Sequence, residues 1–136
     1  MSRVDSATAQ HVRSRGAGRC EYCHFPEVVA ALPFQMDHVI AQKHDGSSDE
    51  SNLAFACYPC NSLKGPNIAG IDPVSGEIVR LFHPRKDVWT EHFAWKDGWL
   101  FGLTSFARAT IQVLSINAPE AVALRESLME EGFIFE

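Results

Sequence analysis

Short apolar runs separated by polar stretches organise the N-terminal half of the chain. Residues near Asp5 to Arg15 predict a helix with Val4, Ala7 and Val12 roughly on one side, and glycines at 16 and 18 would end it. Val28 to Leu32 and Gln35 to Ala41 are rich in apolar and branched residues, so they predict two short strands, with Pro33 limiting the first. We therefore expect a hairpin whose second strand carries Asp37 and His38.

A polar loop and a short helix follow this hairpin. Residues 42–52 are polar, and residues 45–49 are typical of a loop. Leu53 to Cys57 returns to apolar character, and Pro59 suits the first turn of a short helix that reaches about Lys64. Gly65 and Pro66 would stop that helix. The order that we expect is strand, strand, loop and helix.

The C-terminal half predicts a hairpin and two helices. A turn at residues 75–76 precedes an apolar run, and residues 96–98 would join two aromatic strands as a hairpin. Thr104 can cap one helix, and Pro119 can begin another that closes near Gly132. Large aromatic side chains usually pack in the core of a small domain, and we expect this of the three tryptophans, Trp89, Trp95 and Trp99. The alternative is that they stack on nucleic-acid bases.

Length and composition indicate one compact domain over residues 1–136. The chain has 136 residues with 46% hydrophobic content, which suits a single domain with a modest core. It contains no apolar run of about eighteen residues that would span a membrane, and no N-terminal apolar segment of the signal-peptide type. From these features we expect a soluble, cytoplasmic protein.

The net charge of −5 is unfavourable for binding a nucleic acid, whose partners usually present a positive face. Most of the negative excess lies in the second half of the chain. Three arginines, Arg13, Arg15 and Arg19, precede the first cysteine pair, and Lys64 follows the second. Bound divalent ions would reduce the local negative charge further. Nucleic-acid binding is therefore expected to be weak and sensitive to salt.

All four cysteines of the chain form two pairs with the same spacing. Cys20 and Cys23 make one pair, and Cys57 and Cys60 make the other, each with two residues between its members. Two such turns can direct four thiolates at one tetrahedral ion, which is the usual shell of a structural zinc. The alternatives are two disulfides in a secreted domain, or a redox function of the two turns. Zinc is the interpretation that the spacing favours.

The residues between and just after the cysteine pairs resemble the HNH endonuclease family. Asp37-His38, Asn52-Leu53 and the run from Cys57 through Cys60-Asn61 to Lys64 follow the pattern of its zinc-containing branch, which has the ββα-metal fold. The resemblance covers Cys20 to about Gly65, and a weaker one extends from Asp72 to Pro119, similar to the tail of small bacterial members. It implies an α+β protein in which a ββα core (20–66) with a four-cysteine zinc site is extended by a C-terminal layer (70–136) of one hairpin and two helices.

The same resemblance implies a role for each motif residue. His38 would be the general base, which suits an imidazole because its unperturbed pKa of about 6.5 is close to neutral pH. Asp37 and Asn61 would hold a catalytic divalent ion, Mg²⁺ or Mn²⁺, and Asn52 would orient His38 by hydrogen bonding to the loop backbone. The ion would stabilise the phosphate while water attacks in line, so that DNA, with RNA as the alternative substrate, is cut to a 5′ phosphate and a 3′ hydroxyl.

Three basic residues are candidate phosphate contacts. Lys64 lies at the end of the predicted helix, and Arg15 and Arg19 lie before the first cysteine pair. Each of these residues has an ordinary alternative. The positive charge of Lys64 could interact with the helix C-terminus, and the two arginines could be solvated. For the whole chain, the alternative to a nuclease is a zinc-stabilised module that binds nucleic acid or protein and has no catalytic activity.

Overall fold

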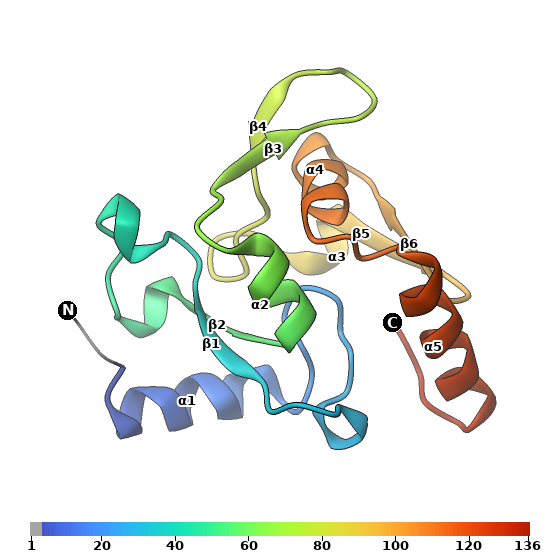
Figure 1. Ribbon diagram of the computed structural model, residues 1–136, viewed down its shortest axis with the longest axis horizontal. Coiled ribbons are helices and arrows are strands. Elements are labelled where there is room, and N and C mark those ends of the chain that lie inside the picture. Colours follow the sequence, from blue (N-terminus) through green and yellow to red (C-terminus); the bar gives the residue numbers. More distant parts are fainter. Residues whose placement is uncertain (1–3) are drawn as a thin grey trace. The chain divides into compact units, whose positions relative to one another are not determined.

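The computed structural model describes residues 4–136, which form two compact units. The first contains residues up to 68 together with 83–86, and the second contains residues 69–82 and 87–136. The described residues mix short helices with three two-stranded antiparallel sheets, so the protein is α+β (Figure 1). No helix among them is both long enough and apolar enough to cross a bilayer.

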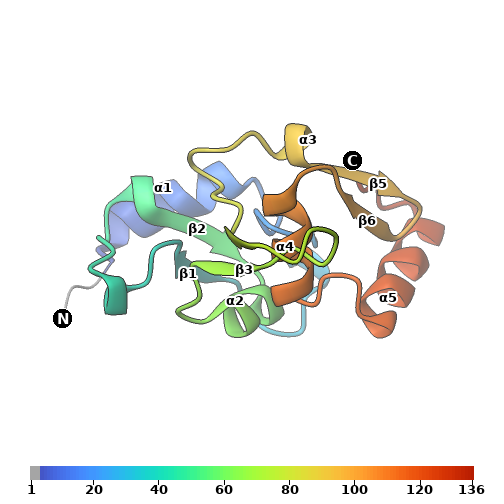
Figure 2. The same cartoon turned by 90° about the horizontal axis from the view of Figure 1, so that it is seen from above.

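The first unit is a ββα arrangement with one additional helix. Strands β1 (Gln35–His38) and β2 (Leu53–Ala56) pair antiparallel, with Asp37 opposite Ala54. Helix α1 (Ser6–Gly16) packs against β2, and helix α2 (Tyr58–Lys64) packs against β1 (Figures 1 and 2). Three single 3₁₀ turns complete the connections: η1 (Glu27–Val29), η2 (Gln42–His44) and η3 (Glu50–Asn52).

The predicted helix near residues 5–15 is α1, and side-chain contacts at each end set its limits. The Asp5 side chain caps the helix by accepting a hydrogen bond of 2.7 Å from the Thr8 amide. At the other end a β-carbon added to Gly16 would lie 2.7 Å from Cδ2 of Phe55, so only glycine allows the helix to approach that ring. The predicted helix is confirmed, and its last residue is fixed by packing.

The predicted strand from Val28 to Leu32 is wrong. This segment contains the turn η1, and the Val28 side chain is 83% exposed. The partner of β1 is instead β2, in which all four residues are buried, so Asp37 and His38 lie on the first strand of the hairpin. Branched apolar residues favour a strand only where neighbouring elements cover them, and here the covered run is Leu53–Ala56.

Phe55 is the centre of the first core. Its ring lies 5.1 Å from that of Phe34, and the Arg13 guanidinium lies 5.0 Å from its centroid. The Phe55 amide donates a 2.8 Å hydrogen bond to the Glu21 carboxylate, which also forms an ion pair with Arg85. This ion pair links residues 83–86 to the first unit.

The second unit is built around helix α4. Hairpins β3–β4 and β5–β6 both contact α4, and a short helix α3 precedes β5 (Figure 2). The bounds are β3 (Ala69–Ile71), β4 (Ile78–Arg80), α3 (Trp89–His92), β5 (Phe93–Lys96), β6 (Trp99–Gly102), α4 (Ser105–Val113) and α5 (Pro119–Glu130). The predicted hairpin at residues 96–98, the Thr104 cap and the start at Pro119 are confirmed. Strand β3 and helix α3 have no counterpart in the sequence predictions.

An aromatic cluster contains two of the three tryptophans. The Trp89 ring lies 5.0 Å from Phe93 and 6.0 Å from Trp95, and Trp95 meets Phe135 at 5.4 Å. Trp99 is 46% exposed on β6, so the prediction of a core position is wrong for this residue. Successive side chains of a strand face opposite sides, and the buried side of β6 is taken by Leu100.

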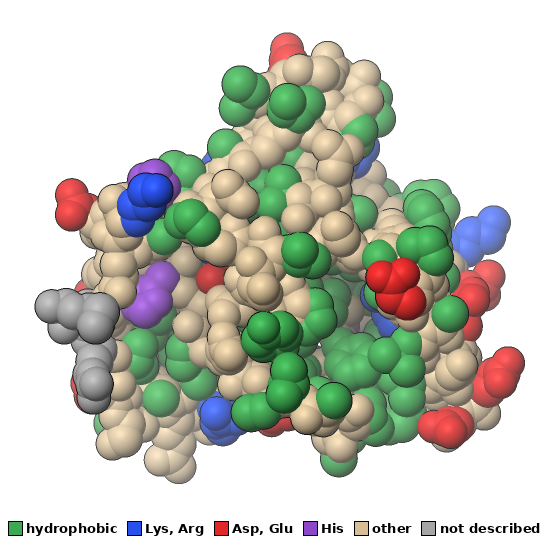
Figure 3. Space-filling model, viewed as in Figure 1, with side chains coloured by type: hydrophobic (Ala, Val, Ile, Leu, Met, Phe, Trp, Pro, Cys, Tyr) green, Lys and Arg blue, Asp and Glu red, His purple; other side chains and the backbone are tan. Residues whose placement is uncertain are grey.

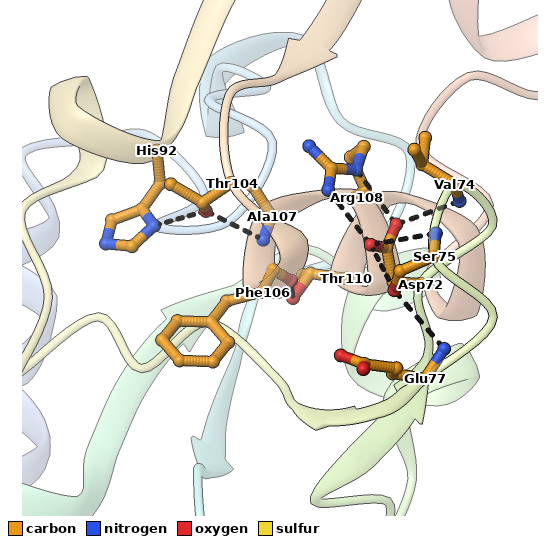
Figure 4. A network of polar contacts seen from close by, with 10 residues as sticks. All are labelled: Asp72, Val74, Ser75, Glu77, His92, Thr104, Phe106, Ala107, Arg108 and Thr110. Carbon is orange, nitrogen blue, oxygen red and sulfur yellow. Dashed lines mark hydrogen bonds and ion pairs between the residues drawn. The ribbon is translucent and has the colours of Figure 1, made fainter.

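A buried carboxylate ties the β3–β4 hairpin to α4 (Figure 4). Asp72 is fully buried, and its two oxygens accept hydrogen bonds of 2.8 and 2.9 Å from Nε and Nη2 of Arg108. The amides of Val74 and Ser75 and the Ser75 hydroxyl also donate to it. The hydrogen bonds from Arg108 hold the pKa of Asp72 well below its usual range, although burial opposes the shift.

We expect Asp72→Asn to lower the melting temperature at neutral pH, by an amount that shrinks in acid. Because the folded pKa of Asp72 is depressed, its stabilisation is complete above the unfolded pKa of about 3.9 and is lost as pH falls toward the folded value. Thermal melts followed by circular dichroism over this pH range measure the difference between variant and wild type. Asp97→Asn, at an exposed turn, should melt like the wild type. A difference that persists unchanged in strong acid would contradict the assignment.

Candidate functional site

The four cysteines converge on one point. Cys20 and Cys23 come from a turn, Cys57 is the N-cap of α2, and Cys60 lies in the first turn of that helix. All four are buried and free, their sulfur atoms lie within 4.8 Å of one another, and those of Cys23 and Cys57 are 3.7 Å apart. A tetrahedral zinc with Zn–S bonds of about 2.3 Å places its sulfurs about 3.8 Å apart. The cluster therefore fits a structural zinc ion.

Backbone hydrogen bonds shape both halves of this shell. In the turn, the Cys20 amide donates to the Phe25 carbonyl and the His24 amide donates to the Cys20 carbonyl, with His24 in the left-handed region at φ 62°. In α2, Pro59 occupies the first turn, and the Asn61 amide donates to the Cys57 carbonyl at 3.0 Å. Among the described residues, no other group of three or more His, Cys, Asp or Glu side chains is placed to hold an ion.

The thiols influence one another strongly because they are buried together. Burial opposes ionisation of Cys20, but hydrogen bonds from the other three thiols outweigh it and bring the Cys20 pKa well below its ordinary value. Hydrogen bonding with Cys20 then raises the pKa of both Cys23 and Cys60 well above it. Ionisation of one thiol thus opposes ionisation of the next, and a bound cation would allow several thiolates to coexist.

Asp37 points into the β1–α2 interface. Its side chain is 3% exposed, Oδ2 accepts a 2.6 Å hydrogen bond from the Tyr22 hydroxyl, and Oδ1 lies 3.2 Å from Nζ of Lys64. Burial raises the pKa of Asp37, while the Lys64 charge counteracts the rise. Burial and the Asp37 charge raise the pKa of Tyr22 well above its ordinary value, so this hydroxyl stays a donor at neutral pH.

Lys64 lies inside the fold, which does not fit the predicted phosphate contact. The side chain is 1% exposed, and Nζ donates both to Asp37 and, at 3.0 Å, to the His38 carbonyl oxygen. An ammonium group that is enclosed and hydrogen-bonded in this way does not reach a phosphate on the surface. The sequence reasoning placed Lys64 at the surface because it ends a short helix, where lysines are usually solvated.

The two arginines predicted to contact nucleic acid hydrogen-bond to backbone of their own unit. Nη2 of Arg15 donates to the carbonyl oxygens of Glu50 and Leu53 at 3.0 and 2.9 Å. Nη1 of Arg19 donates to the carbonyl oxygen of His24 at 3.0 Å. Arg15 thereby fixes the backbone at the start of β2, and Arg19 fixes the backbone of the turn that carries Cys20 and Cys23.

Asn61 lies on the face of α2 that meets β1. Its side-chain nitrogen donates to Oε1 of Gln35, and the residue is half-buried. Gln35 and Asp37 leave β1 on the same side because side chains alternate along a strand. The structure thus brings Asp37, Asn61 and Lys64 to one interface between β1 and α2.

His38 leaves β1 on the opposite side and is half-buried. Its Nε2 atom lies 2.9 Å from Oγ of Ser48, in the loop that connects η2 to η3. The loop turns back sharply, since a β-carbon added to Gly46 would lie 1.6 Å from the Ile40 carbonyl oxygen. The ring is therefore held at the edge of the unit by a compact loop.

Asn52 fixes that loop from within. It is 8% exposed, its Oδ1 accepts from the Ile40 amide at 2.9 Å, and its Nδ2 donates to the carbonyl oxygens of Ile40 and Ser47 at 2.9 and 2.8 Å. These bonds tie the backbone two residues after His38 to the backbone one residue before Ser48.

Three residues of the site, Tyr22, Gln35 and Ser48, were not predicted from the sequence. Only their closeness in the sequence to the motif residues could have drawn attention to them.

Comparison with known families identifies the first unit. Residues 20–67, less than half of the chain, match the family model described as HNH endonuclease. The matched segment contains the cysteine cluster, strand β1 and helix α2, so it is an HNH endonuclease domain whose four cysteines fit the zinc-containing branch. Searches of curated proteins and of solved structures give no significant match.

We expect Cys57→Ser to release zinc and destabilise the first unit. A structural zinc contributes about 10–16 kcal/mol of binding free energy, which a shell with a missing thiolate would largely lose. Metal analysis of the purified protein, together with thermal melts, measures both effects. Ser62→Ala, on the exposed side of the same helix, serves as the control and should keep its zinc. Full zinc content and an unchanged melting curve in Cys57→Ser would remove the metal assignment.

We expect Asn52→Ala to loosen the loop next to His38. The Ile40 amide loses its acceptor, and a hydrogen bond with a net value of about 1.4 kcal/mol corresponds to roughly tenfold faster amide exchange. Hydrogen exchange followed by NMR measures the Ile40 amide directly. Asn67→Ala, at an exposed site beyond α2, should leave this rate unchanged. Equal protection of Ile40 in Asn52→Ala and wild type would refute the anchoring role.

Proposed function

We propose that the HNH domain is a metal-dependent endonuclease that hydrolyses phosphodiester bonds in DNA. The observation that carries the proposal is the position of His38: Nε2 lies at the edge of the unit, 2.9 Å from a loop hydroxyl, in a loop held by Asn52. The two other motif side chains, Asp37 and Asn61, lie on the adjoining β1–α2 interface. The base and one oxygen ligand thus come from adjacent residues of β1, and the second oxygen ligand comes from α2.

His38 acts as the general base. The attacking water gives its proton to Nε2 as its oxygen forms the bond to phosphorus, and the 3′ oxygen departs on the opposite side. The products carry a 5′ phosphate and a 3′ hydroxyl. The contact with Ser48 fixes the direction of the ring, and Nε2 leaves this contact when it takes the proton from water. Asn52 contributes by fixing the loop backbone on both sides of that contact.

Asp37 and Asn61 supply oxygen ligands for a hard divalent ion. Each Asp37 oxygen accepts one hydrogen bond and retains a second lone pair that could face an ion. The side-chain amide of Asn61 donates a hydrogen bond through its nitrogen, so the amide oxygen remains as the ligand atom. Such a donor set suits Mg²⁺ or Mn²⁺, with water and phosphate oxygens completing the shell. An ion held there would stabilise negative charge on the phosphate and on the departing oxygen.

The basic surface near His38 is small. Lys43 and His44 form part of the exposed turn η2, between β1 and the loop of Ser48. Figure 3 shows histidine and basic side chains at the surface over the loops that connect β1 to β2. With few cations in this region we propose weak, salt-sensitive DNA binding. Four thiols bound to an ion also suit a reducing compartment, so we place the activity in the cytoplasm.

We expect His38→Ala to abolish plasmid cleavage in Mg²⁺ or Mn²⁺. Loss of a general base lowers the rate by about 10²–10⁴-fold, which conversion of supercoiled plasmid to nicked and linear forms measures. The control is His11→Ala, which removes an exposed histidine of helix α1 in the same unit and should cleave like the wild type. Both variants should retain zinc. Equal cleavage by His38→Ala and wild type would show a contaminant or another site, and DNA binding without cleavage by the wild type would indicate a binding module.

A further inference from the structure

A buried cluster of polar side chains underlies strand β1. Tyr22 and Lys64 are 0% and 1% exposed, Asp37 between them is 3% exposed, and all three are joined by hydrogen bonds. Tyr22 comes from the cysteine turn and Lys64 from the last turn of α2. The cluster thus connects three segments of the unit at the residue proposed to bind the catalytic ion.

We infer that Lys64 and Tyr22 are positioning residues, which hold the Asp37 carboxylate and the His38 peptide from inside the fold. The inference rests on the proposed nuclease function, since it assigns the two side chains a task in that site. Neither residue touches substrate. Their effect passes through Asp37, which both contact, and through the His38 carbonyl oxygen, which Lys64 contacts.

The contacts leave the carboxylate little freedom. Tyr22 donates to Oδ2 at 2.6 Å and Lys64 donates to Oδ1 at 3.2 Å, so the two oxygens are held by donors from different segments. Rotation of the carboxyl group would break both bonds at once. One lone pair on each oxygen stays available, and its direction is set by these two donors. A ligand held in this way does not have to be ordered when an ion binds.

Lys64 also joins the two catalytic side chains to each other. Its Nζ binds the carboxylate of Asp37 and the carbonyl oxygen of His38, so one ammonium group fixes a side chain and the following peptide of the same strand. Because His38 leaves the strand on the other side, fixing its peptide limits the direction in which its ring can point. Lys64 therefore acts from the interior of the fold and does not contact a phosphate.

The test separates positioning from phosphate contact by comparing turnover with binding. Lys64→Met removes the charge with little change in shape, and Tyr22→Phe removes only the hydroxyl. For each we expect kcat to fall, by about tenfold or more for Lys64→Met and less for Tyr22→Phe, with unchanged KM and unchanged DNA affinity measured without divalent ions. The salt dependence of that affinity should equal that of the wild type, because no phosphate contact has been lost.

Lys86→Met is the matched control, since it removes an exposed lysine of the same unit to which no role in the site is assigned. Its kcat should remain that of the wild type at saturating DNA. Zinc content and melting temperature are measured for every variant. If Lys64→Met does not retain zinc, Tyr22→Phe decides, because it alters one bond of the same cluster without removing a charge.

Two results would overturn the inference. One is weaker DNA binding by Lys64→Met with a salt slope reduced by about one and an unchanged kcat, which is the signature of a lost phosphate contact. The other is a folded Tyr22→Phe variant with the kcat of the wild type. Failure of the proposed function gives a different result, namely no His38-dependent cleavage by the wild type, and it would end both proposals.

Discussion

Four buried thiols around one point can ionise together only with a cation among them. Hydrogen bonding with Cys20 raises the pKa of both Cys23 and Cys60 well above the ordinary value, which opposes full ionisation of the shell by itself. A zinc ion would satisfy this requirement and would at the same time fasten the turn at residues 20–23 to the start of α2. The remaining geometry follows from this attachment, because Asn61 directly follows Cys60 and Lys64 lies one helical turn later.

A strand with two different faces then separates the polar groups. Asp37 projects into the β1–α2 interface, and His38 projects to the edge of the unit. A buried carboxylate is tolerable only when it is paired and hydrogen-bonded, and removing one partner of a buried ion pair costs about 3–5 kcal/mol. Lys64 and Tyr22 meet that condition for Asp37. Lys64 and Tyr22 thus stabilise the buried Asp37 carboxylate, and the same two side chains set its orientation as a ligand in the proposed site.

The sequence predicts those features that depend on neighbouring residues. The spacing of the cysteines, the Thr104 cap and the helix start at Pro119 are all local, and the structure contains each of them. The partner of β1 is not local, because pairing depends on which distant segment is covered. For this reason residues 28–32 were mistaken for a strand.

In the candidate site, too, local features can be predicted from the sequence and long-range contacts cannot. The motif residues are recognisable from their order, whereas their contacts are not. A lysine in the last turn of a helix usually complements the helix dipole and remains solvated, and nothing in the sequence distinguishes Lys64 from that ordinary case. Its burial follows from the position of Asp37 on the facing strand, which only the folded chain specifies. Likewise, Tyr22 lies between two cysteines of the cluster and becomes a donor to Asp37 through the fold alone.

The internal use of basic side chains also determines how such a protein could bind DNA. In the first unit Arg13 pairs with Glu27, Arg85 pairs with Glu21, and Lys64 pairs with Asp37. These cations are neutralised at short range, in a chain whose net charge is −5. At about 0.1 M salt, charges separated by more than about 10 Å are largely screened, so long-range attraction of DNA would be weak. Productive binding then depends on contacts at the site itself, and a divalent ion between Asp37 and the phosphate would supply positive charge where the protein supplies little.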